Sequence, residues 1–101
     1  SMGGYVALMA SCVVETHAVF LMAPALYMRG YNEEYCSGHS HLEIVHGWSD
    51  DILPPKNSIR YAREADCTLH MISGDHPLKS SIEVVDSLFR QFFEKALASP
   101  G

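Results

Sequence analysis

The sequence has few basic residues and no long apolar run. Lysine and arginine number 7 against 12 aspartate and glutamate residues, which gives a formal net charge of −5. Nucleic acids and anionic membrane surfaces bind basic patches, so this balance disfavours both as partners. No apolar run approaches the ~18 residues of a membrane span, and no basic residue precedes the first apolar stretch, as one would in a signal peptide. We therefore expect a cytoplasmic protein that does not act at a membrane.

Cysteine is also scarce. Cys12, Cys36 and Cys67 are odd in number and widely spaced, which makes a poor disulfide framework and fits a reducing compartment. With 101 residues, of which 48% are apolar, the chain can form at most one domain with a modest core. We treat residues 1–101 as a single, partial domain.

Apolar segments alternate along the chain in a pattern that predicts an α/β fold. Residues 18–22 are a short continuous apolar run, which is typical of a strand covered on both faces. An apolar stripe from Ile82 to Ala96, after the capping-box spacing of residues 80–83, predicts an amphipathic helix, and we expect Phe89, Phe92 and Phe93 to pack in the core. The expected elements are a buried helix (2–14), strands (18–22, 42–46 and 67–72) and helices (56–65 and 82–96), with a loop over 24–40.

This order predicts a three-layer α/β/α arrangement with a short parallel sheet, because helices that alternate with strands cross over between parallel neighbours. The most apolar helix opens the chain with no strand before it, although such a helix normally follows one. We therefore expect that the first half of the fold is absent from this chain.

Three short motifs carry the side chains of a hydrolytic site. Residues 1–4 (Ser-Met-Gly-Gly) precede the first helix, residues 46–54 (His-Gly-Trp-Ser-Asp-Asp-Ile-Leu-Pro) follow the second strand, and residues 74–76 (Gly-Asp-His) follow the third. A serine hydroxyl needs an adjacent base to become a nucleophile, an imidazole titrates near neutral pH, and a carboxylate orients the imidazole. The carboxyl ends of parallel strands share one edge, so the three groups can meet there.

In the order and form of these motifs the chain resembles the α/β-hydrolase superfamily, in the style of its short bacterial members without a cap domain. The resemblance covers nearly the whole chain and implies the C-terminal half of that fold. It implies Ser1 as the nucleophile, His76 as the general base and acid, Asp50 as the orienting carboxylate, and the backbone N–H of Met2 as an oxyanion donor.

The implied activity is hydrolysis of an ester, thioester or amide bond in a small acyl substrate, with no cofactor and no metal. A second oxyanion donor would come from the absent half, and loss of one such donor costs on the order of 10²- to 10³-fold in rate. We therefore expect this chain alone to be weak or inactive.

Several alternatives remain open at this point. Ser1 could be a remnant of an expression tag or an N-terminal nucleophile that uses its own amine as the base. Asp51 could replace Asp50, although the spacing from residues 46–47 favours Asp50. His76 could be an ordinary loop histidine, and Trp48 could pack at the sheet edge or line a substrate pocket.

Two further readings concern other classes of function. Cys36, His39, His41 and His46 suggest a zinc site, but a structural zinc site needs well-separated ligand pairs on rigid turns, so this reading is disfavoured. The chain could also be a non-catalytic fragment that forms a homodimer or exchanges elements through an exposed sheet edge.

Overall fold

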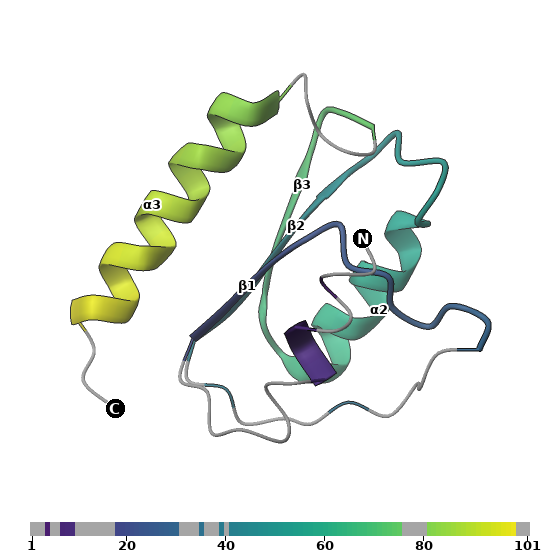
Figure 1. The fold of residues 1–101 in the computed structure, drawn as a ribbon, viewed down its shortest axis with the longest axis horizontal. Coiled ribbons are helices and arrows are strands. Elements are labelled where there is room, and N and C mark those ends of the chain that lie inside the picture. The colour runs from purple at the N-terminus through teal and green to yellow at the C-terminus, as the bar shows by residue number, and fades with distance from the viewer. Residues whose placement is uncertain are drawn as a thin grey trace.

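The computed structural model describes residues 4, 7–9, 18–30, 35, 39, 41–75 and 81–98. Gly4 and residues 7–9 are helical, and the rest of the helix expected over 2–14 lies outside the described residues. The elements that follow are β1 (Ala18–Met22), β2 (His41–Gly47), α2 (Pro55–Ala65), β3 (Thr68–Ile72) and α3 (Ile82–Ala98) (Figure 1).

The three strands form one parallel sheet in the order β1-β2-β3, which confirms the predicted sheet. The bounds of β1 match the apolar run that predicted it. Strand β3 begins one residue later than expected, because the amide of Cys67 donates to the carbonyl of Ala62 and Asp66 adopts the left-handed conformation that ends α2. Cys67 therefore belongs to the end of the helix.

Helices cover both faces of the sheet, with α2 on one side and α3 on the other (Figure 1), and this confirms the α/β/α layers. Side chains alternate across a strand, so each face has its own core. The α2 face is formed by Leu8, Val19, Leu21, Leu26, Leu42, Ile44 and Tyr61. The α3 face is smaller and consists of Val45 and Val85, with Phe20, Ile72 and Leu88 packed against them.

The expectation for the phenylalanines of α3 is only partly right. Phe92 is buried and its ring lies 5.3 Å from that of Phe20, but Phe89 is 44% exposed and Phe93 is 51% exposed. The physical reason is that α3 is the only described element on this face of the sheet. The sheet covers one side of the helix, so Phe89 meets Phe20 at 5.4 Å along only part of its ring and the rest of that flank stays exposed. Neither of the complete described helices is long and apolar enough to cross a bilayer.

The start of α3 is tied to the end of β3. The hydroxyl of Ser81 donates to the carbonyl oxygen of Ser73, so the helix begins directly beside the loop that leaves the sheet. Ser80, the first residue of the expected capping box, lies outside the described residues.

The assigned core predicts that two leucines differ in how much they contribute to stability. Leu21 is 2% exposed and Leu97 is 70% exposed. We expect Leu21→Ala to lower the free energy of unfolding by about 2–5 kcal/mol, because it removes buried methyl groups and leaves a cavity. The matched control Leu97→Ala should change it by less than about 0.5 kcal/mol. Urea unfolding followed by circular dichroism measures both, and equal effects would contradict the assigned core.

Candidate active site

Asp50 lies in a tight turn directly after β2. Its amide donates to the carbonyl oxygen of Gly47, and its Oδ1 accepts hydrogen bonds from the amides of Ile52 at 3.0 Å and Leu53 at 2.8 Å. An aspartate that bonds the backbone two or three residues later is a common way to fix a turn. This turn buries Asp50, which is 5% exposed, and leaves Asp51 in solvent. Of the two candidate carboxylates, Asp50 is therefore the one held in a fixed position.

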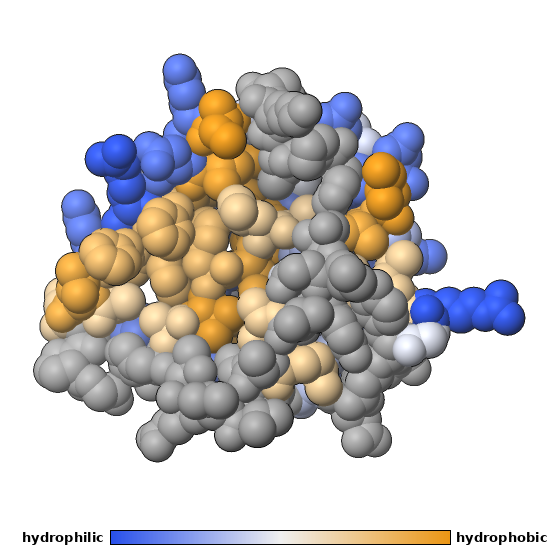
Figure 2. Space-filling view, in the orientation of Figure 1, coloured by the Kyte–Doolittle hydropathy of each residue, from blue (hydrophilic) through white to orange (hydrophobic). Residues whose placement is uncertain are grey.

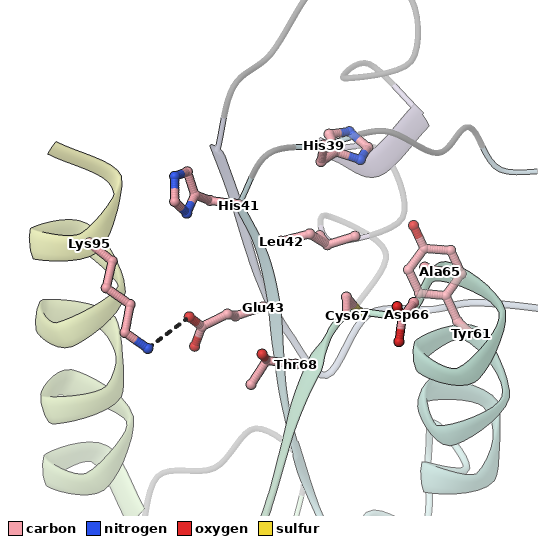
Figure 3. Close-up of a pocket in the computed structure, with 10 residues that line it drawn as sticks. All are labelled: His39, His41, Leu42, Glu43, Tyr61, Ala65, Asp66, Cys67, Thr68 and Lys95. Carbon is pink, nitrogen blue, oxygen red and sulfur yellow. Dashed lines mark ion pairs between the residues drawn. The ribbon is translucent and has the colours of Figure 1, made fainter. Parts of the chain in front are cut away.

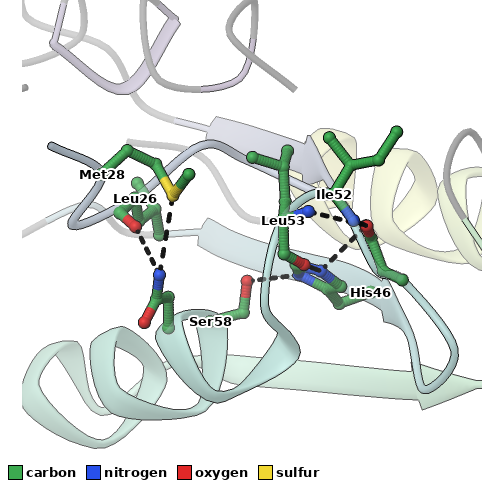
Figure 4. Close-up of polar contacts among 8 residues, drawn as sticks. Leu26, Met28, His46, Ile52, Leu53 and Ser58 are labelled. Carbon is green, nitrogen blue, oxygen red and sulfur yellow. Dashed lines mark hydrogen bonds and ion pairs between the residues drawn. The ribbon is translucent and has the colours of Figure 1, made fainter.

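His46 lies beside this carboxylate and is fully buried. Its Nε2 is 2.8 Å from the carbonyl oxygen of Leu53 and 3.2 Å from Oδ2 of Asp50, and its Nδ1 is 2.7 Å from the hydroxyl of Ser58 on α2 (Figure 4). The sequence predicted no such role for either residue. One signal for His46 was available, because the sequence places it near the end of β2 and four residues before Asp50. No sequence pattern pointed to Ser58.

The pairing of β2 and β3 continues past the ends of both strands. The amide of Trp48 donates to the carbonyl oxygen of Ile72 at 2.9 Å, and that of Ser49 donates to the carbonyl oxygen of Gly74 at 3.0 Å. Gly74 has a φ of 145°, which residues with a side chain rarely adopt. The Asp50 turn is thus bonded to the loop that leads directly into residue 76.

The first motif also approaches this edge of the sheet. A Cβ atom on Gly4 would lie 3.0 Å from Cα and Cβ of Pro24, which follows the carboxyl end of β1. This close approach requires glycine at position 4. Segments from all three motifs therefore lie at the carboxyl edge of the sheet, each beside the end of a different strand.

Three of the four predicted site residues, Ser1, Met2 and His76, lie outside the described residues, and Asp50 is the one whose surroundings are described. Trp48 is 61% exposed, so most of its side chain lies in solvent beside the carboxyl edge. The four predicted roles remain predictions that rest on the positions of the neighbouring segments.

The histidines of the zinc reading lie apart. His41 begins β2 and His46 stands near its end, and five residues of strand separate them by roughly 16 Å. Both ring nitrogens of His46 already have protein partners. Among the described residues, no three histidine, cysteine or acidic side chains lie close enough to hold a metal. Cys36 lies outside the described residues.

A polar pocket of about 280 Å³ opens at the opposite, amino edge of the sheet (Figure 3). Glu43 lines it, and its carboxylate lies 2.7 Å from Nε2 of His70 and 3.9 Å from Nζ of Lys95. Burial raises the pKa of the Cys67 thiol, and burial raises the pKa of Tyr61 to about 12. The amino edge of a parallel sheet is not where ligands usually bind, so we exclude this pocket from the candidate active site.

Comparison with solved structures identifies the fold. The chain superposes on a protein of Xanthomonas campestris assigned to the α/β hydrolase superfamily, with a TM-score of 0.81 and 27% identity, over 98% of this chain and 55% of that one. It also matches a lid-less α/β serine hydrolase of Xanthomonas campestris, with a TM-score of 0.83 and 17% identity, over 100% of this chain and 47% of that one.

A third match is an α/β serine hydrolase homologue from Coxiella burnetii, with a TM-score of 0.68 and 17% identity, over 90% of this chain and 45% of that one. No protein-family model and no curated protein matches the sequence. The chain spans about half the length of these neighbours. Over the part that it shares with these neighbours, the chain has the fold of the α/β-hydrolase superfamily.

Proposed function

We propose that this chain carries the catalytic triad of a serine hydrolase that cleaves an ester, thioester or amide bond. Ser1 is the nucleophile, His76 the general base and acid, Asp50 the orienting carboxylate, and the Met2 N–H an oxyanion donor. The observation that supports this most strongly is the bond between the Asp50 turn and the loop before His76, through Ser49 and Gly74. Gly4 against Pro24 supports the arrival of the serine motif at the same edge.

The proposed reaction is ordinary acyl transfer. His76 takes the proton of the Ser1 hydroxyl as its oxygen attacks the carbonyl carbon, and the oxyanion that forms accepts a hydrogen bond from the Met2 amide. His76 then gives the proton to the leaving group, which departs and leaves an acyl group on Ser1. In the second half, His76 takes a proton from water as the water attacks this acyl group, and returns it to the Ser1 oxygen as the acid leaves. Asp50 holds the imidazole in the required tautomer and stabilises its charged form, a role that suits a buried carboxylate fixed by two backbone amides.

The neighbours set the scope of this proposal. They are about twice as long as this chain. A complete hydrolase active site of this fold therefore includes residues outside this chain, among them a second oxyanion donor. The proposed substrate is a small acyl compound, and no cofactor takes part. The cytoplasmic location remains a prediction that rests on the cysteine pattern.

A fluorophosphonate probe tests the triad, because it reacts with activated serines. In a longer protein that contains this chain together with the second oxyanion donor, we expect mass spectrometry to find the label on Ser1, and Ser1→Ala and His76→Ala to abolish it. This chain alone should be labelled weakly or not at all. Asp50→Asn should lower the labelling rate on the order of 10³- to 10⁴-fold, since it leaves the imidazole in the wrong tautomer. Asp51→Asn is the matched control and should leave the rate unchanged. Equal rates in the two asparagine variants, or a label on another serine, would contradict the proposal.

A second candidate function is self-association through the sheet edge. A groove of about 350 Å³ runs between β1 and α3, and hydrophobic residues gather on this side of the molecule (Figure 2). Its lining is largely apolar and consists of Phe20, Met22, Ile82, Val85, Asp86 and Phe89. Strand β1 is an edge strand with five consecutive apolar residues, and such an edge pairs readily with another chain.

Light scattering after size-exclusion chromatography tests this candidate. We expect the 101-residue chain to form a dimer whose fraction rises with concentration, and Met22→Lys, at a side chain 53% exposed in the groove, to make it monomeric. Ile52→Lys is the control, because Ile52 is 61% exposed but does not line the groove. A monomer at every concentration would exclude the homodimer and favour coverage of the groove by the rest of a hydrolase fold.

A further inference from the structure

The carboxylate of Asp50 is fixed on both of its oxygens. Oδ1 accepts the amides of Ile52 and Leu53, and Oδ2 faces Nε2 of His46 at 3.2 Å. The backbone amides alone hold one oxygen and leave the carboxylate plane able to tilt about it. The contact of Oδ2 with His46 is a third contact, in addition to the two amides on Oδ1, and it restricts rotation of the carboxylate plane.

The partners of His46 determine its tautomer. The carbonyl oxygen of Leu53, 2.8 Å from Nε2, can only accept a hydrogen bond, so Nε2 carries the proton. In the neutral ring Nδ1 is then an acceptor, and the hydroxyl of Ser58 donates to it at 2.7 Å. The Nε2 proton therefore points at the carbonyl oxygen of Leu53, with Oδ2 of Asp50 close beside Nε2 at 3.2 Å, and the ring cannot turn over without losing its bonds to Leu53 and Ser58.

Ser58 connects this arrangement to helix α2. It is fully buried, and the neighbouring Asn57 donates to the carbonyl oxygen of Leu26, beyond the end of β1, at 3.0 Å. The first turn of α2 thus holds the end of β2 and the segment that follows β1 (Figure 4).

We propose that His46 and Ser58 are positioning residues for Asp50. Ser58 fixes the tautomer of His46, and His46 fixes the plane of the carboxylate that His76 is to meet. The inference rests on the proposed function. A purely structural role fits less well, because three buried polar side chains are costly unless fully paired, and apolar side chains of similar size generally stabilise a core at least as well.

Two substitutions of His46 test whether a donor at the Nε2 position is what matters. In His46→Gln the side-chain amide nitrogen can reach the position of Nε2, where it can donate to Leu53 and lie beside Oδ2 of Asp50, whereas in His46→Asn it reaches only the position of Nδ1. The matched control is His70→Gln, since His70 forms a similar pair with Glu43 at 2.7 Å on the other face of the sheet.

The first measurement is hydrogen exchange at the amides of Ile52 and Leu53, which does not depend on activity. We expect His46→Asn to speed their exchange roughly 10-fold relative to amides of β1 and β3, since a looser carboxylate is a poorer acceptor. His46→Gln and His70→Gln should leave this ratio close to that of the wild type. A general loss of stability would accelerate all amides and leave the ratio unchanged.

The second measurement is catalysis, by fluorophosphonate labelling and by steady-state hydrolysis of a p-nitrophenyl ester. We expect His46→Asn to lower the labelling rate and kcat on the order of 10- to 100-fold with KM unchanged, because a misplaced orienting group slows the chemical step. His46→Gln should restore most of the rate, and Ser58→Ala should lower it less than His46→Asn.

The outcomes separate the two proposals. A wild-type protein that is never labelled overturns the proposed function. An unchanged exchange ratio in His46→Asn overturns the positioning role, whether or not the protein is active. If that ratio changes but the labelling rate of an active protein does not, His46 is only structural and the inference is likewise overturned.

Discussion

The structure depends on the parallel pairing of β2 with β3 and on its continuation beyond the last strand residues. Parallel strands end at the same edge of a sheet, but pairing alone does not place the loops that follow. Here two additional backbone hydrogen bonds, from Trp48 and Ser49, join the turn after β2 to the loop after β3. Through backbone atoms they bring the turn that holds a buried carboxylate beside Gly74, two residues before a histidine.

Helix α2 adds the second constraint. Its buried Ser58 and its Asn57 reach back to the carboxyl edge, where Ser58 bonds His46 near the end of β2 and Asn57 bonds Leu26 beyond the end of β1. The other face of the sheet is less fully covered, because only Val85 and Phe92 of α3 are buried and the outer flank of that helix is exposed. The α2 face of the sheet therefore has the larger core and the polar contacts of the candidate site, whereas the α3 face leaves an apolar groove open to further contacts. This asymmetry agrees with a chain that spans about half of its structural neighbours.

The elements were predictable where local pattern determines them. The apolar run of β1 and the stripe of α3 gave both elements, and the spacing after Gly47 indicated the residue that proves to be the buried aspartate. The exposure of Phe89 and Phe93 was not predictable, because it depends on what lies over the outer flank of α3. The contact of Ser58 with His46 was also hidden, since it arises only when the first turn of α2 packs against a buried side chain near the end of β2. Both depend on tertiary packing, which sequence periodicity does not encode.

The most direct test of the central claim is the proton of the His76 ring. If Asp50 and His76 meet at the carboxyl edge, nuclear magnetic resonance of histidine-labelled protein should show a proton on His76 Nδ1 shifted far downfield and protected from solvent, and Asp50→Asn should remove it. Nitrogen signals of a solvent-exposed imidazole for His76, unchanged by Asp50→Asn, would contradict the account.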